Sequence, residues 1–123
     1  STAAAAPAVL DREAGLRLTG GNAALYRSLL ARFGEAQADT AAQLQAARLA
    51  QDSVLARRIA HSLKGSAAQL GAPALAAAAS RLEQAIVDGQ PDEQLDPLVE
   101  ALGLEQTRLL AQLAQDRDTT GQN

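Results

Sequence analysis

The chain has 123 residues, of which 47% are hydrophobic and 2% aromatic, and its formal net charge is −3. This length suits one domain with a single hydrophobic core. The acidic balance argues against a nucleic-acid surface, which needs a broad positive patch. The chain has no cysteine, which excludes a disulfide framework and a thiolate metal site.

Residues 1–8 are rich in alanine and include one proline. They lack the charged and long apolar regions of a signal peptide, so we interpret them as a linker from a longer polypeptide or as a cloning remnant. No apolar run in the sequence approaches the roughly 20 residues that a membrane-spanning helix needs. The sequence therefore predicts no membrane insertion and favours a cytoplasmic domain.

Alanine and leucine supply most of the apolar residues, and no window alternates as a half-buried strand does. The predicted fold class is therefore all-α. A short first helix is expected over residues 9–17, and its apolar side combines Val9, Leu10 and Leu16.

The second helix is expected over about residues 23–50, because Asn22 follows a glycine break and is a suitable N-cap. Gly34 allows a local bend inside this helix. Its predicted buried stripe consists of Leu25, Leu29, Phe33 and Leu44.

Asp52 predicts the N-cap of a third helix, which Gly71 ends, and Pro73 suits the first turn of a fourth helix over 73–87. The apolar side of the third helix is expected to combine Leu55, Ile59, Leu63 and Leu70, with Ala56, Ser66 and Ala67 around them. That of the fourth is expected to combine Leu75, Ala79, Leu82 and Ile86.

A fifth helix is expected over about residues 92–115, with inward leucines at 95, 98, 102, 109 and 113. Pro97 is tolerated in a first turn only, which leaves Asp96 as an alternative N-cap. The polar residues 117–123 are expected to form a frayed tail. Together these elements predict an antiparallel four-helix bundle over residues 9–116, with a short additional N-terminal helix.

His61 is the only histidine of the chain. Because a helical residue advances about 100° around the axis, His61 falls opposite the apolar side of its helix, where Val54 is the one apolar neighbour. Cations and small residues are expected around it: Arg57, Arg58, Lys64, Gly65 and Ala68. A nucleophilic imidazole in a cationic, uncrowded setting indicates chemistry on a phosphoryl group.

The sequence around His61 resembles the signature of histidine phosphotransfer (HPt) domains. The similarity rests on His61-Ser62-Leu63-Lys64-Gly65, on Leu70-Gly71-Ala72 and on Leu82-Glu83. Residues 25–33 are also similar to the preceding helix of that family, and the resemblance covers roughly residues 10–113.

The resemblance implies a phosphorelay intermediate of two-component signalling, which accepts a phosphoryl group from one receiver-domain aspartate and passes it to another. His61 matches the phosphorylated histidine, Lys64 a lysine that stabilises phosphoryl charge, and Gly65 a glycine that gives the partner access. Arg57, Arg58 and Ala68 are secondary candidates at the docking surface. Family members often orient the imidazole with a polar residue of the neighbouring helix, and Glu83 or Gln84 falls near that position.

The sequence contains no glycine-rich phosphate loop, no recognisable ATP site and no acidic cluster typical of a magnesium site. We therefore expect a phosphotransfer module without autonomous kinase activity, without a bound metal or cofactor, whose partner supplies the aspartate and Mg²⁺. The expected partners are response-regulator receiver domains and a hybrid histidine kinase. The domain is expected to be a monomer, either a free protein or the C-terminal domain of a membrane-bound hybrid sensor kinase.

Other functions fit the sequence less well. A helical module that docks a receiver without carrying phosphate would use the same fold. A membrane-surface role would draw on the amphipathic helices, but the acidic balance and the lack of aromatic anchors count against it. A hydrolase is weaker still, because the single histidine has no evident triad partners.

Overall fold

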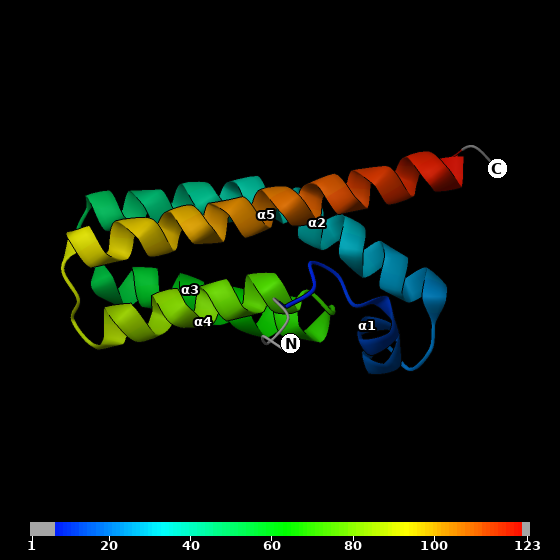
Figure 1. Ribbon diagram of the computed structural model, residues 1–123, viewed down its shortest axis with the longest axis horizontal. Coiled ribbons are helices and arrows are strands. Elements are labelled where there is room, and N and C mark those ends of the chain that lie inside the picture. Colours follow the sequence, from blue (N-terminus) through cyan, green and yellow to red (C-terminus); the bar gives the residue numbers. More distant parts are fainter. Residues whose placement is uncertain (1–6, 122–123) are drawn as a thin grey trace, which may run out of the picture.

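The computed structural model describes the backbone of residues 7–121 and the side chains of residues 7–116. Its helices are α1 (Arg12–Leu18), α2 (Ala23–Leu49), α3 (Ser53–Gln69), α4 (Pro73–Val87) and α5 (Asp92–Gly121). The helices α2 and α5 form one layer of an antiparallel bundle, α3 and α4 form the other, and α1 lies at one end (Figure 1). The predicted all-α bundle with an additional N-terminal helix is confirmed.

The predicted helix ends are set by local interactions. Asn22 Oδ1 accepts a hydrogen bond from the backbone N–H of Leu25 at 3.0 Å, and Asp52 Oδ1 accepts one from Leu55 at the same distance. Gly71 ends α3 with φ at 79°, in the left-handed region that glycine adopts without a steric cost. Pro73 begins α4, where its missing N–H has no helical partner to lose.

The first helix begins later than predicted, because Asp11 is its N-cap and Val9 and Leu10 precede it. This preceding segment lies against the turn between α3 and α4. Asp11 N–H donates to the carbonyl of Gly71 at 2.6 Å, and the N–H of Ala74 donates to the carbonyl of Ala8 at 3.0 Å. The prediction that Val9 and Leu10 are helical was wrong, because these hydrogen bonds and packing of both side chains on the core hold the segment outside the helix.

The buried stripe of α2 is shifted by one position at its start. Leu25 is 44% exposed, whereas Tyr26 and Leu30 are buried, so the prediction for Leu25 was wrong. The Tyr26 hydroxyl donates to the carbonyl of Leu70 at 2.7 Å. Its ring lies so close to Gly15 that a Cβ there would collide with it. Tyr26 thus joins α1 and α2 to the end of α3.

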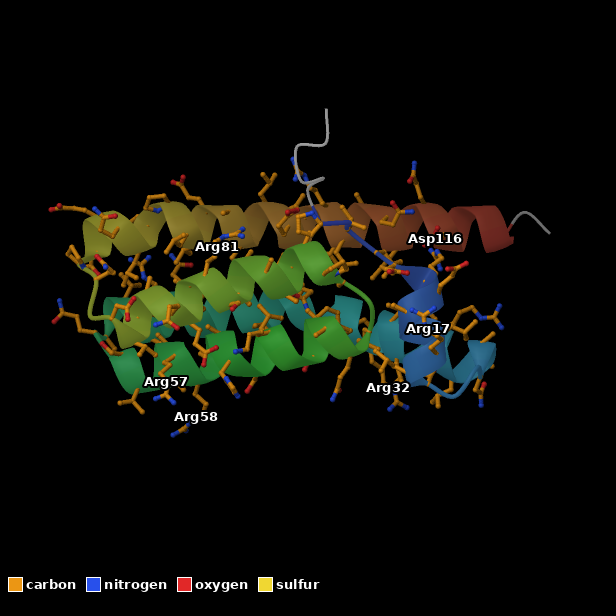
Figure 2. The ribbon with its side chains drawn as sticks, turned by 60° about the horizontal axis from the view of Figure 1, so that its bottom comes forward. Arg17, Arg32, Arg57, Arg58, Arg81 and Asp116 are labelled. Carbon is orange, nitrogen blue, oxygen red and sulfur yellow. The ribbon has the colours of Figure 1, made fainter. Side chains whose placement is uncertain are left out.

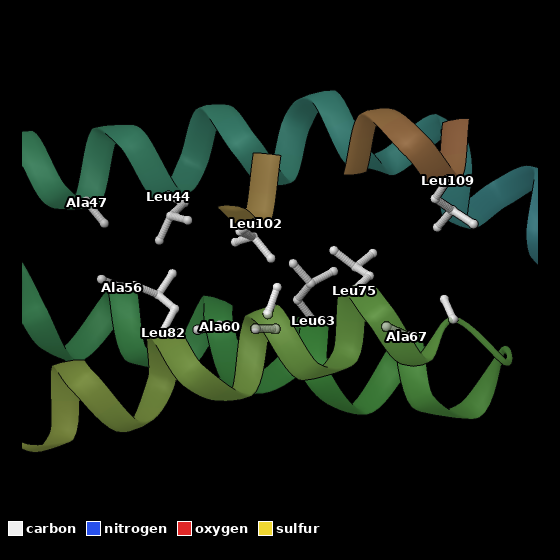
Figure 3. Close-up of a cluster of buried hydrophobic side chains, with 13 residues drawn as sticks. Leu44, Ala47, Ala56, Ala60, Leu63, Ala67, Leu75, Leu82, Leu102 and Leu109 are labelled. Carbon is white, nitrogen blue, oxygen red and sulfur yellow. The ribbon is translucent and has the colours of Figure 1, made fainter. Parts of the chain in front are cut away.

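The core lies between the two layers, where leucines of α2 and α5 face those of α3 and α4 (Figure 3). On α3 the buried residues are Ala56, Ala60, Leu63 and Ala67. The predicted core residue Leu55 is 38% exposed, and Ser66 is also exposed. The prediction failed because α3 packs on α4 through its alanines, whose small side chains let the two backbones approach closely.

The fifth helix begins at Asp92, so the alternative start at Asp96 was wrong, and Pro97 lies inside the helix. An arginine at the end of α2 holds this start: Arg48 Nη2 lies 2.5 Å from Asp96 Oδ1 and 3.7 Å from Asp92 Oδ1. The helix continues to Gly121, beyond the predicted end at residue 115 and through part of the segment expected to fray. Residues 1–6, most of the predicted linker, lie outside the described residues, as do 122–123.

Candidate functional site

His61 lies on the outer face of α3 because its helical neighbours Ala60 and Leu63 are buried in the core. Its side chain is 64% exposed. The imidazole is therefore fixed to a packed helix at its backbone and open to an approaching molecule at its ring.

Glu83 of α4 connects His61 to Lys64. One carboxylate oxygen, Oε2, lies 2.7 Å from His61 Nδ1, and the other, Oε1, lies 2.7 Å from Lys64 Nζ. The Glu83 side chain is 13% exposed, whereas that of Lys64 is 36% exposed. Each carboxylate oxygen thus has its own donor, and the three side chains form one network across α3 and α4.

This contact assigns different roles to the two ring nitrogens. A neutral imidazole carries a proton on only one of its two nitrogens. Because the Glu83 carboxylate lies 2.7 Å from Nδ1 and can only accept a hydrogen bond, the proton is held on Nδ1. The lone pair then resides on Nε2 of the exposed ring. Nε2 of His61 is therefore the nitrogen that is available as a nucleophile.

The network keeps Glu83 ionised. The hydrogen bond from Lys64 lowers the pKa of the Glu83 carboxyl below its usual range, and burial opposes this effect. The hydrogen bond from His61 lowers the same pKa further. At neutral pH Glu83 is thus a carboxylate, which is the form that accepts from both donors.

Exposed cations precede His61 on α3, and exposed small residues follow it. Arg57 and Arg58 are exposed on the outer side of α3 (Figure 2). Gly65 and Ala68 are also exposed, and a Cβ built on Gly65 would have no atom within 4 Å. Packing inside the domain therefore does not require a glycine at position 65. A glycine within a helix nevertheless lowers stability by about 1 kcal/mol relative to alanine.

Of the two residues considered for orienting the imidazole, Glu83 makes the contact with His61. Gln84 instead donates from Nε2 to Asp88 Oδ1 at 2.9 Å, one turn further along α4. The sequence pattern predicts Lys64 and Glu83 each near His61 but does not pair them with one another. This pairing depends on the register between α3 and α4, which no local sequence pattern encodes.

The described part of the chain contains neither a candidate metal centre nor a candidate membrane-spanning helix. Among its side chains, no group of three or more histidine, aspartate or glutamate residues could hold a metal ion. None of the described helices combines the length and the apolar character needed to cross a membrane.

Comparison with known families agrees with this geometry. The model of the Hpt domain family matches residues 28–119. The chain belongs to the Hpt domain family. Hpt domains are histidine phosphotransfer carriers of phosphorelays rather than kinases, and receiver domains are their partners.

A solved structure shares the fold of this Hpt domain. It is the HPT domain of a sensor hybrid histidine kinase from Shewanella, with a TM-score of 0.78 and 21% sequence identity. The alignment covers 90% of this chain and 95% of that chain. A search of curated proteins found no match.

Proposed function

We propose that this Hpt domain carries a phosphoryl group on Nε2 of His61, accepting it from the aspartyl phosphate of one receiver domain and passing it to an aspartate of another. The observation that carries the proposal is the 2.7 Å contact between Glu83 Oε2 and His61 Nδ1 on a ring that is 64% exposed. This contact directs the lone pair of the imidazole to the nitrogen that faces solvent.

The transfer needs no proton to leave the site. The Nε2 lone pair attacks phosphorus, the bond between phosphorus and the aspartyl oxygen breaks, and the aspartate departs as a carboxylate. The imidazole keeps its Nδ1 proton and becomes positively charged. Glu83 lies where this charge develops, and a carboxylate held in place beforehand stabilises it. The reverse sequence returns the phosphoryl group to a second aspartate.

Lys64 has a positioning role in this scheme. Its ammonium group contacts Glu83 Oε1, so it fixes the carboxylate that in turn fixes the imidazole. With its side chain 36% exposed, it could also approach a phosphoryl group on the neighbouring histidine. Phosphoryl charge is spread over three oxygens and is stabilised by fixed cations, and Arg57 and Arg58 add to that field.

The remaining components belong to the partner. We place Mg²⁺ and the reacting aspartate on the receiver domain, and we assign no cofactor to this chain. We also place the domain in the cytoplasm as a monomer, supplied with phosphoryl groups by a hybrid histidine kinase. The fold shared with the domain of such a kinase from Shewanella supports this assignment.

The test is transfer of radioactive phosphate from a panel of phosphorylated receiver domains. The wild-type domain is expected to gain label that is labile in acid and stable in base, as a phosphohistidine is. His61→Gln is expected to gain none, because the amide has no nucleophilic nitrogen. Circular dichroism checks that this variant keeps its helices, which the exposure of His61 leads us to expect. Label retained by the folded His61→Gln variant would contradict the proposal.

A further inference from the structure

Charge is unevenly distributed between two helices of the bundle. The segment of α3 carries three cations and no carboxylate, whereas residues 92–116 of α5 carry six carboxylates and one cation. Both helices pack on α2 and α4, and they belong to different layers (Figure 1). The domain therefore presents a basic helix in one layer and an acidic helix in the other, although its net charge is only −3.

The cations of α3 differ in their partners. Lys64 is paired with Glu83, whereas neither Arg57 nor Arg58 forms an ion pair with any described residue. Both arginines are exposed and extend outward, one helical turn before His61 (Figure 2). Their charges are thus available to a molecule that approaches the imidazole.

We propose that Arg57 and Arg58 form an electrostatic docking surface for the phosphorylated receiver domain, and that phosphorylation of His61 weakens this attraction. The proposal rests on the proposed function and adds a regulation of the same site. Before transfer, the two arginines, Lys64 and Glu83 together carry a charge of +2, with a neutral His61. Transfer adds a phosphoryl group of about −2 and makes the imidazole positively charged, so the local charge falls from +2 to about +1.

The reaction itself therefore weakens the complex. Breaking the bond to the aspartyl oxygen and forming the bond to Nε2 moves negative charge from the receiver onto the basic surface. Arg57 and Arg58 precede His61 by four and three residues, which is about 4.5 to 6 Å along the helix. This separation is shorter than the Debye length of about 8 Å at physiological salt, so the arginines can interact with the bound phosphoryl group. Attraction to the receiver declines, and the partner dissociates more readily.

The positive charges of Arg57 and Arg58 favour a negatively charged partner at this docking surface. A receiver whose aspartate carries a phosphoryl group presents negative charge at the point that must reach His61. Complementary potentials accelerate encounter and orient it, while like charges oppose it. The acidic α5 would repel the same partner, so productive encounters are directed to α3. Gly65, which no neighbouring atom crowds, leaves room for close approach.

The test uses a receiver domain that labels His61 in the transfer experiment above, and it measures association rates by stopped flow at low and high salt. The variant is Arg57→Gln/Arg58→Gln. The matched control is Arg17→Gln/Arg81→Gln, which removes the same charge from two exposed arginines of α1 and α4 (Figure 2).

We expect the α3 variant to associate about tenfold more slowly than the wild type at low salt and to lose most of its salt dependence. The control is expected to remain within about twofold of the wild type, because its arginines lie on other helices. Wild-type domain phosphorylated beforehand with phosphoramidate is expected to associate more slowly than the unphosphorylated domain and to lose part of its salt dependence, because it loses one unit of local charge where the α3 variant loses two.

An unchanged salt dependence in the α3 variant, or an unchanged rate for the phosphorylated domain, would overturn this proposal. Normal labelling of His61 together with either result would leave the proposed function standing. Absence of label on the wild type would instead overturn the proposed function, and this proposal with it. Circular dichroism of all variants confirms that the comparison is between folded domains.

Discussion

At the scale of single residues, Glu83 is the side chain on which the site depends most. It links His61 to Lys64 through two contacts of 2.7 Å. A glutamine at this position could still accept a hydrogen bond from Nδ1, but it would carry no charge to stabilise the phosphorylated imidazolium. A hydrogen bond to a charged group contributes about 1.5–3 kcal/mol. The substitution therefore separates the geometric role of residue 83 from its electrostatic role.

We predict that Glu83→Gln slows phosphoryl acceptance by roughly tenfold to a hundredfold, which is that energy expressed as a rate. Single-turnover transfer from a phosphorylated receiver measures the change. Gln84→Ala is the matched control, because Gln84 contacts Asp88 rather than His61. Equal rates for Glu83→Gln and the wild type would remove the carboxylate from the mechanism.

The same variant has a predicted signature in stability. The pKa of Glu83 is lowered in the folded domain, so its contribution is complete above the usual glutamate pKa of about 4.3 and is lost as the pH falls through the lowered value. The free energy of unfolding of the wild type should thus exceed that of Glu83→Gln by more at pH 7 than at acid pH. Urea denaturation at several pH values measures this difference.

Gly65 allows stability and function to be separated at one position. A methyl group there meets no atom within 4 Å, so we predict that Gly65→Ala raises the free energy of unfolding by about 1 kcal/mol. We also predict that Gly65→Leu folds but transfers phosphate at least tenfold more slowly, because its side chain would project into the approach path. Thermal unfolding and transfer assays check the two parts. Fast transfer by a folded Gly65→Leu variant would show that the bare surface is unnecessary.

At the scale of elements, the turn between α2 and α3 contains a residue in an unfavourable conformation. Gln51 has φ at 56°, and it is the only described residue other than glycine with a positive φ. The N–H of the next residue, Asp52, bonds back to the carbonyl of Ala47 at 2.8 Å, which closes the end of α2. Glycine is the usual residue at such a helix end.

We predict that Gln51→Gly raises the free energy of unfolding by about 1 kcal/mol, because a left-handed conformation costs about that much for a residue with a Cβ. Chemical denaturation measures the gain. Gly89 supplies the opposite control: its φ is 70°, and Gly89→Ala should destabilise the domain by a similar amount. A loss of stability in Gln51→Gly would show that the glutamine side chain has a role that outweighs the strain.

The helix ends could be predicted from the sequence, and the buried faces only in part. Asn22, Asp52, Gly71 and Pro73 act through neighbours within a few residues, so their effect is visible in the sequence itself. Burial of Tyr26 rather than Leu25 depends on α1 folding over the start of α2. Exposure of Leu55 depends on how α3 packs against α4. Both outcomes are set by packing between helices and not by the residues of one helix alone.

At the scale of the whole molecule, the same distinction applies to the site. The position of His61 on an exposed face followed from helical periodicity, because that face is fixed by the apolar residues of its own helix. The contact of Glu83 with Lys64 could not be predicted from helical periodicity, because it joins two different helices. The sequence also shows that α3 is basic and α5 acidic, but it does not show that the two helices lie in different layers of the bundle.

The segment that lies against the turn between α3 and α4 has a consequence for alignment. His61 and Glu83 are about 12 and 15 Å along their helices from that turn, at 1.5 Å per residue. The turn is fastened by the hydrogen bonds from Asp11 to Gly71 and from Ala74 to Ala8. One additional helical residue between that turn and Glu83 would rotate Glu83 by about 100° around the axis of α4 and carry it away from the imidazole. The turn between α3 and α4 thus fixes the position of the carboxylate beside the nucleophile, although it is remote from both.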